Sequence, residues 1–589
     1  MKDFLKYTLA TIVGLIIASI LFFIVMLASV SAIVSSGNKP ISINNNSILV
    51  LNAGVPVPDR GDQNPIGNID LLNMTITSTP GLNEILQNIR KATEDSKIKG
   101  ILIENGLSSS GWATTEEIRS ALLKFRESGK FVISYSDYIT TQECYYLATA
   151  ADKIYVNPES MVDFKGLSSE VMFFKKALEK LGVEVQVTRH GKFKGAVEPF
   201  ILDKLSEENK AQIKDYTGSI WNQIINDISR ARNIPPDELN RIADDLSGNL
   251  APGALEAKLV DGLLYRDQLI DTLKSLIRIT SDKDLNMVSM NKYSKVPDTK
   301  MNYSSKNKIA VIYASGTIVT GKARDGEIGG IAYGDVISKI RRDTTIKAVV
   351  MRVNSPGGSA TASDIIWREL ELTAKVKPVV ISMGNYAASG GYYISAPGTK
   401  IYADPMTISG SIGVFGLIPD ASKLLEEKLG LSTETLNTNK NSDFPSVTRP
   451  MNTYEKELMQ MSIEKIYGDF VSRVAMGRKM SNESVDSIGQ GRVWSGTSAM
   501  KIGLVDEMGG LDDAIKGAAE LADLHGYSIR ELPVLEDPYL RLISQLNGEI
   551  KMKILKNQLG ESMKYYNMIQ EVKNLSGIQA RLPYFIDIH

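Results

Sequence analysis

The chain has 589 residues, 43% hydrophobic and 23% charged, a globular composition with room for about three or four domains. Its 67 Lys and Arg residues balance 68 Asp and Glu residues, and the net charge of -1 argues against a nucleic-acid-binding protein and an acidic disordered chain. The single cysteine, Cys144, excludes an intramolecular disulfide and a cysteine-based zinc site. The three histidines argue against a multi-histidine metal site and against a histidine base.

The N-terminal segment, residues 1–46, is interpreted as a short cytoplasmic end followed by a transmembrane anchor. Residues 7–38 carry no charged side chain, and a membrane-spanning helix needs about 20 apolar residues. Lys2 and Lys6 precede this run, which predicts that the N-terminus lies inside and the remaining chain outside the cell membrane. The alternative is a cleaved signal peptide, but the apolar part of such peptides runs to only about 7–15 residues.

Residues 47–290 and 309–535 are predicted to be two copies of one domain. The segment YYLATAADKIYVNP (145–158) matches YYISAPGTKIYADP (392–405) at an offset of 247 residues. Further matches follow in the same order at offsets of 245 and 248 residues. Collinear matches at a near-constant offset indicate an internal duplication.

The second copy alternates short apolar segments with helical stretches, which predicts an α/β domain with a mainly parallel sheet. The predicted strands are IAVIYA (309–314), AVVMRV (348–353), PVVISM (378–383) and KIYADP (400–405), and the predicted helices are YGDVISKIRRDT (333–344) and SDIIWRELELTAK (363–375). A polar linker, 291–308, joins the copies, and a C-terminal tail, 536–589, has helical periodicity over 550–559.

Two glycine-rich turns follow strands of the second copy, NSPGGSA (354–360) and AASGGYY (387–393). Backbone N–H groups at the start of a helix have no partner within that helix. Two such turns side by side direct donors at one point, as an oxyanion hole requires. We predict Gly358 and Gly390 as these donors, and Ser389 as the nucleophile of an acyl transfer. The alternative is that these small residues only allow a helix to pack closely on the sheet.

A serine nucleophile needs a base, and lysine is the next candidate where histidine is scarce. A lysine base must be neutral, so burial must lower its pKa from the usual value of about 10.4. The first copy offers Lys192 and Lys194, which could equally be ordinary surface lysines. In the repeat alignment Ser389 falls on Gln142, and Lys194 falls on Ser442. Each copy therefore lacks one half of a Ser/Lys pair, and we expect the site where two unlike copies meet, within one chain or between chains.

Four segments resemble the signal peptide peptidase A family in its long, tandem-repeat, membrane-anchored form, and the resemblance extends to about residue 530. They are GKFKGAVEPF (191–200), NSPGGS (354–359), MGNYAASGGYYIS (383–395) and PMTISGSIGVFG (405–416). The resemblance implies a Clp-protease/crotonase-like fold for both copies and a serine peptidase with Ser389 as nucleophile and Lys194 as general base. It also implies that Gly358 and Gly390 form the oxyanion hole and that Ser411 orients the lysine amine.

The same resemblance implies a homotetramer in the cell inner membrane, with its catalytic bulk on the periplasmic side. The implied substrates are apolar peptides such as remnants of cleaved signal peptides, and no metal, cofactor or nucleic acid is implied. Three alternatives stay open: a crotonase-type acyl-CoA enzyme, a non-catalytic membrane scaffold, and a broader quality-control protease of membrane proteins.

Overall fold

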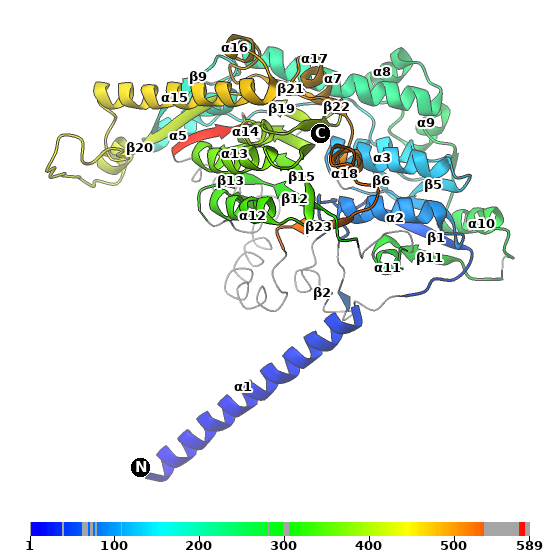
Figure 1. Ribbon diagram of the computed structural model, residues 1–589. Helices are drawn as coiled ribbons and strands as arrows, with labels where there is room; N and C mark the ends of the chain where they lie inside the picture. Colours follow the sequence, from blue (N-terminus) through cyan, green and yellow to red (C-terminus); the bar gives the residue numbers. More distant parts are fainter. Residues whose placement is uncertain are drawn as a thin grey trace.

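The two copies contain parallel sheets with the same strand order, which is the structural basis of the sequence repeat (Figure 1). The computed structural model describes residues 2–37, 41–61, 69–70, 75–76, 79–107, 109–280, 282–298, 305–321, 323, 326–534 and 577–582. The first sheet runs β10 (Gly262–Leu263), β7 (Lys153–Val156), β5 (Phe131–Ser136), β4 (Ile98–Glu104), β1 (Ser47–Asn52), β11 (Asn286–Ser289). The second runs β22 (Glu507–Met508), β18 (Lys400–Ala403), β17 (Val379–Ala388), β15 (Ile346–Ser355), β12 (Lys308–Ser315), β23 (Ser528–Leu532).

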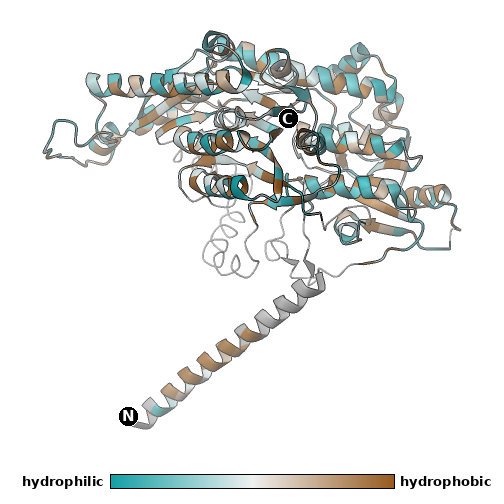
Figure 2. Cartoon of the chain, in the orientation of Figure 1, coloured by the Kyte–Doolittle hydropathy of each residue, from teal (hydrophilic) through white to brown (hydrophobic). Residues whose placement is uncertain are grey.

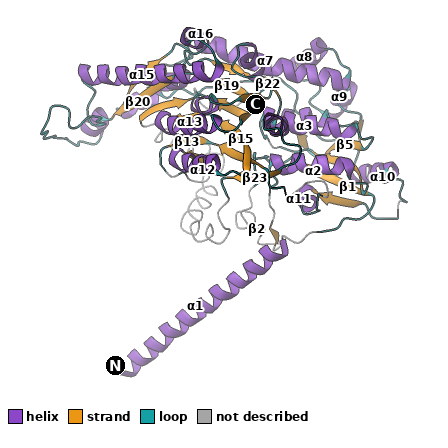
Figure 3. Ribbon diagram, in the orientation of Figure 1, coloured by secondary structure: helices purple, strands orange, loops and turns teal. Residues whose placement is uncertain are grey.

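Equivalent helices flank the two sheets and follow equivalent strands (Figure 3). In the first copy they are α2 (Leu82–Glu94), α3 (Trp112–Arg126), α4 (Gln142–Ala148), α7 (Glu207–Arg232), α8 (Pro236–Asp245), α9 (Ala251–Glu256) and α10 (Arg266–Leu276). Their counterparts are α12 (Gly330–Arg342), α13 (Ala360–Ala374), α14 (Gly390–Ser395), α15 (Thr453–Arg478), α16 (Asn482–Ile488), α17 (Gly496–Lys501) and α18 (Leu511–Leu521). The prediction of two tandem α/β copies is therefore confirmed.

The strands of both sheets are apolar along most of their length because helices cover them, as is usual for parallel sheets. In Figure 2 these strands are mostly brown, whereas the outer helices carry much teal. The four apolar segments predicted as strands in the second copy coincide with β12, β15, β17 and β18. The two predicted helices coincide with α12 and α13. Arg352 departs from the apolar pattern, because it is a charged residue that lies within β15 and is fully buried.

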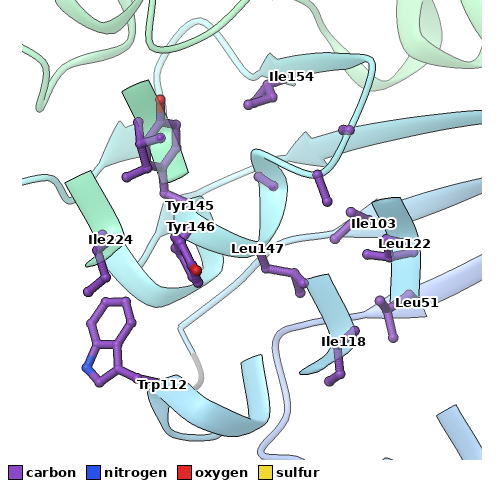
Figure 4. Close-up of a cluster of buried hydrophobic side chains, with 14 of the residues drawn as sticks. Leu51, Ile103, Trp112, Ile118, Leu122, Tyr145, Tyr146, Leu147, Ile154 and Ile224 are labelled. Carbon is purple, nitrogen blue, oxygen red and sulfur yellow. The ribbon is translucent and has the colours of Figure 1, made fainter. Parts of the chain in front are cut away.

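The core of the first copy lies between its sheet and helices α3, α4 and α7 (Figure 4). Figure 4 shows Trp112 of α3 near Tyr146 of α4, with Ile224 of α7 beside them. The rings of Trp112 and Tyr146 meet edge to face, with their centroids 6.0 Å apart. This packing holds α4 in place, and α4 begins at Gln142, the counterpart of the predicted nucleophile.

A third sheet joins the copies, and it positions the candidate site. Its order is β14 (Glu327–Gly329), β13 (Thr317–Val319), β16 (Gly357–Ser359), β24 (Gly577–Arg581), β20 (Val414–Asp420), β9 (Glu184–His190). Strand β9 belongs to the first copy, but it pairs antiparallel with β20 of the second copy from Glu184 to His190. The segment that follows β9 therefore enters the second copy. Further elements of the second copy are β19 (Ile408–Gly410) and β21 (Val493–Ser495), which extend its main sheet from β17.

Shorter elements complete the described chain. They are β2 (Ile69–Asp70), β3 (Thr75–Ile76), β6 (Ile139–Thr140), β8 (Met161–Val162), α5 (Lys175–Leu181), a 3-10 turn (Gly195–Val197), α6 (Glu198–Ile201), α11 (Met290–Ser294) and a π-helical turn (Leu424–Lys428).

The N-terminal helix α1 (Lys2–Gly37) covers the segment predicted as a membrane anchor. Within the described part of the chain, no helix reaches the combination of length and apolar character that a membrane crossing requires. The predicted transmembrane helix is thus not shown.

The predicted linker and the predicted tail contain unexpected order. The predicted linker, 291–308, begins with residues of α11, where Tyr293 is buried and its carbonyl oxygen accepts a 2.7 Å hydrogen bond from Lys91 Nζ of α2. In the predicted helical tail, the periodic stretch 550–559 lies outside the described residues. In the described part, 577–582, residues Gly577–Arg581 form strand β24 and not a helix, because they pair with β16 and β20. Local periodicity does not report such distant pairing.

Candidate active site

Ser389 occupies a strained turn between β17 and α14. Its backbone has φ 55° and ψ -115°, an unusual conformation for a residue other than glycine. The Ser389 N–H donates to Gly410 O at 2.8 Å, and its carbonyl oxygen accepts from Tyr393 N at 2.8 Å. These bonds fix the strand-to-helix turn, and its strain resembles the geometry that exposes a nucleophilic side chain at the end of a strand.

Lys194 reaches the same place from the first copy, just after β9. The preceding Phe193 is anchored on both sides, because its N–H donates to Gln490 O at 3.0 Å and its carbonyl oxygen accepts from Gln212 Nε2 at 3.0 Å. A Cβ on Gly491 would lie 2.7 Å from Lys194 N, so a glycine is needed for the chain to pass here. The Lys194 side chain is fully buried as a result.

The amine of Lys194 contacts both predicted serines. Its Nζ lies 2.9 Å from Ser389 Oγ, 3.0 Å from Ser411 Oγ and 3.1 Å from Ser411 O. Burial lowers the pKa of Lys194 well below its ordinary value of 10.5. A neutral amine has two N–H donors and one lone pair. The two Ser411 oxygens match the donors, and the lone pair is then free to accept the Ser389 hydroxyl proton.

The other residues that sequence left open lie elsewhere. Lys192 is exposed, and its Nζ lies 5.2 Å from the centroid of the Phe193 ring. His190 Nδ1 lies 2.7 Å from Glu464 Oε2, and the His190 ring stacks on Tyr467. His589 lies outside the described residues. The structure thus brings Lys194, and not Lys192, to Ser389, and it does so within one chain.

The glycines of the NSPGG turn lie against the start of α14. Gly357 and Gly358 have φ of 101° and 154°, and a Cβ on Gly358 would lie 2.0 Å from Ile318 O. A Cβ on Gly390 would lie 3.1 Å from Gly358 N, so the two predicted donor residues adjoin. Their closeness to each other and to Ser389 is the arrangement that an oxyanion hole needs.

A buried ion cluster that the sequence analysis missed holds the NSPGG strand to the first copy. Arg352 Nε lies 2.8 Å from Asp59 Oδ1, and Arg352 Nη2 lies 2.6 Å from Glu117 Oε1. Asp59 also accepts from Asn354 Nδ2 at 2.8 Å and from Ser315 Oγ at 2.8 Å. Burial acts to raise the pKa of Asp59, but the Arg352 charge and these hydrogen bonds outweigh it and lower that pKa. An arginine inside the apolar strand AVVMRV was the available signal.

The position equivalent to each dyad residue is occupied, in the other copy, by a residue with a different role. Gln142 Oε1 accepts from Lys165 N and from Gly166 N, each at 2.9 Å, and so ties down a loop of the first copy. Ser442 lies in a loop of the second copy, and its N–H donates to Asn439 O at 3.1 Å. Among the residues that the structure describes, no group of three or more His, Cys, Asp and Glu side chains is arranged to hold a metal ion.

Comparisons with known proteins agree with the duplication. The model of peptidase family S49 matches twice, over residues 124–280 and 371–525. "Protease 4" of Haemophilus influenzae is 34% identical over 548 residues, which cover 90% of this chain and 88% of that protein. "Serine protease SPPA, chloroplastic" of Arabidopsis thaliana is 31% identical and covers 87% of this chain and 76% of its own length. Among solved structures, a ClpP1 variant from Listeria monocytogenes is 15% identical and covers 35% of this chain and 94% of its own, with a TM-score of 0.23.

Proposed function

The chain belongs to peptidase family S49 and is a serine peptidase, and on this basis we propose that it cleaves peptides with a dyad of Ser389 and Lys194. The observation that carries the proposal is the 2.9 Å contact between Lys194 Nζ and Ser389 Oγ, both fully buried. The family favours a peptidase over the acyl-CoA enzyme and the non-catalytic scaffold that the sequence left open.

The proposed reaction begins when neutral Lys194 takes the hydroxyl proton of Ser389. The resulting alkoxide attacks the carbonyl carbon of the scissile peptide bond, and the N–H groups of Gly358 and Gly390 stabilise the tetrahedral oxyanion. Lys194 then returns the proton to the leaving amine. A water molecule, deprotonated by Lys194, hydrolyses the acyl-enzyme and regenerates Ser389. Such Ser-Lys pairs are a variant of the serine-protease triad.

Ser411 is proposed to position the base. Its hydroxyl and carbonyl oxygens, 3.0 and 3.1 Å from Lys194 Nζ, accept hydrogen bonds from the amine and direct its lone pair at Ser389. Ser411 has φ 50°, and its N–H donates to Arg492 O at 2.6 Å, which fixes this turn.

We further propose a membrane-anchored homotetramer in the inner membrane, facing the periplasm, which degrades remnants of signal peptides and other apolar peptides. The uncharged run at residues 7–38 supports the anchor. A broader role in the quality control of membrane proteins uses the same chemistry. The accumulation of undegraded signal-peptide remnants or of intact membrane proteins in cells lacking the protein separates these two roles.

The dyad is tested by hydrolysis of a fluorogenic apolar peptide with the detergent-solubilised full chain. We expect Ser389→Ala and Lys194→Ala to lose at least about 1000-fold in kcat, as base and nucleophile removal does in other serine proteases. Lys192→Ala is the matched control and keeps its activity, because Lys192 is exposed. Full activity of either dyad variant overturns the proposal. Co-sedimentation of the wild type and of a variant lacking residues 1–46 with lipid vesicles tests the anchor.

A further inference from the structure

Strand β24, from the C-terminal tail, lies in the position that a peptide substrate of Ser389 would take. It pairs antiparallel with β16 on one side and with β20 on the other (Figure 1, red arrow). β16 carries Gly358, and β20 follows Ser411 in the chain. A chain that adds a strand between two exposed edges uses its backbone for binding and its alternate side chains for recognition.

The register of β24 places one carbonyl group at the predicted oxyanion donors. Gly358 is paired with Ala580, and the Leu582 N–H donates to Pro356 O at 2.8 Å. Hydrogen-bonded pairs recur every second residue in an antiparallel ladder, so the Gly358 N–H faces Ala580 O. A Cβ on Gly390 would lie 3.0 Å from Ala580 O and 3.1 Å from Gly358 N. The Ala580 carbonyl oxygen therefore lies where the oxyanion would form.

The side chains of this segment are held as those of a bound peptide would be. Ala580 is 1% exposed, so its methyl group is enclosed. Two residues before it, Ile578 packs against the core of the second copy, and two residues after it, Leu582 packs against the core of the first. The dyad of Ser389 and Lys194 is itself fully buried, with this strand beside it. The segment is thus bound on both sides of the Ala580 carbonyl.

Resting on the proposed function, we propose that this chain is its own substrate and that it is cleaved between Ala580 and Arg581. Ser389 Oγ bonds to the carbonyl carbon of Ala580 and loses its proton to Lys194. The C–N bond to Arg581 breaks, and the nitrogen leaves as an amine with the proton from Lys194. Water then hydrolyses the ester, which yields a chain ending in Ala580 and frees the segment that begins at Arg581.

The enclosed Ala580 methyl group also predicts which side chains the site accepts before the scissile bond. Because the Ala580 side chain is buried, the site accepts a small residue before the scissile bond, and a large residue at that place would have to displace its surroundings. Ala580→Gly is therefore expected to be cleaved, whereas Ala580→Trp is expected to be cleaved at least about tenfold more slowly.

The test is intact-mass and C-terminal peptide mass spectrometry on the purified full chain, with hydrolysis of a fluorogenic peptide measured on the same samples. We expect the wild type to end at Ala580 and Ser389→Ala to retain Arg581 and the residues after it. A wild type that hydrolyses the peptide but keeps Arg581 overturns self-cleavage while the proposed function stands. A wild type inactive on the peptide overturns the proposed function and, with it, this inference. If Ser389→Ala also ends at Ala580, another protease makes the cut, and this result too overturns self-cleavage.

The size series gives a second measurement that does not depend on an inactive variant. Ala580→Gly and Ala580→Trp both keep the dyad intact, so both should hydrolyse the added peptide. Self-cleavage of Ala580→Trp at the wild-type rate and bond contradicts the register described above.

Discussion

Removing Asp59 should destabilise the protein, because the Asp59 carboxylate is a buried partner of Arg352. The two side chains are 2% and 0% exposed, and their ion pair measures 2.8 Å. Breaking a buried pair by deleting one partner costs about 3–5 kcal/mol, since a charge is left without compensation. Here Arg352 keeps Glu117 at 2.6 Å, but Asn354 and Ser315 also lose their acceptor. We therefore expect Asp59→Ala to lower the free energy of unfolding by about 3–5 kcal/mol.

Urea denaturation of the solubilised full chain measures this loss, and Asp245→Ala is the matched control. Asp245 pairs with Arg241 at 3.2 Å, but both side chains are more than half exposed, so its removal should cost less than about 1 kcal/mol. Arg352 and these hydrogen bonds lower the pKa of Asp59 below 3.8 against the effect of burial, so its stabilisation is complete above about pH 3.8. That stabilisation is lost as pH falls through the folded-state pKa. Equal losses for both variants, or a difference that persists in strong acid, refute the reasoning.

Three further predictions concern the site. The value of kcat/KM should rise with pH, with a midpoint well below 10.5, because burial lowers the pKa of Lys194 and only the neutral amine is a base. A midpoint near 10.5 would contradict the assignment of a buried, neutral Lys194 as the base. Ser411→Ala should lower kcat about tenfold through loss of one hydrogen bond to Lys194, and unchanged kinetics argue against positioning by Ser411. Gly358→Ala keeps its N–H, but its Cβ would lie 2.0 Å from Ile318 O and would displace that donor, so kcat should fall by about 100- to 1000-fold, as it does when an oxyanion donor is lost. Gly218→Ala, whose Cβ meets open space, should keep wild-type kcat.

Local sequence patterns predicted the elements of the fold well, and the repeat predicted that the site lies where two unlike copies meet. Apolar segments located β12, β15, β17 and β18 because strands buried on both faces need apolar residues throughout. The glycine-rich turn predicted Ser389, the scarcity of histidine indicated a lysine base, and the family resemblance favoured Lys194 over Lys192. The structure adds that one chain contains both halves.

Long-range pairing was beyond the sequence patterns, because hydrophobic periodicity records only which face of an element is covered. The pairing of β9 with β20, which places Lys194 in the second copy, joins segments more than 200 residues apart. The pairing of the tail strand β24 with β16 and the Asp59–Arg352 ion pair also join segments that are far apart in the sequence. An arginine within an apolar strand pointed to a buried partner but not to which acid supplied it.

Covalent labelling with a serine-reactive phosphonate, followed by peptide mass spectrometry, tests the central claim most directly. We expect modification of Ser389 in the wild type, at a rate that rises with pH as Lys194 loses its proton. We expect Lys194→Ala to be labelled at least about 100-fold more slowly, because general-base catalysis contributes about that much or more. Modification of another serine, or equally fast labelling of Ser389 in Lys194→Ala, would contradict the claim that these two residues form the catalytic dyad.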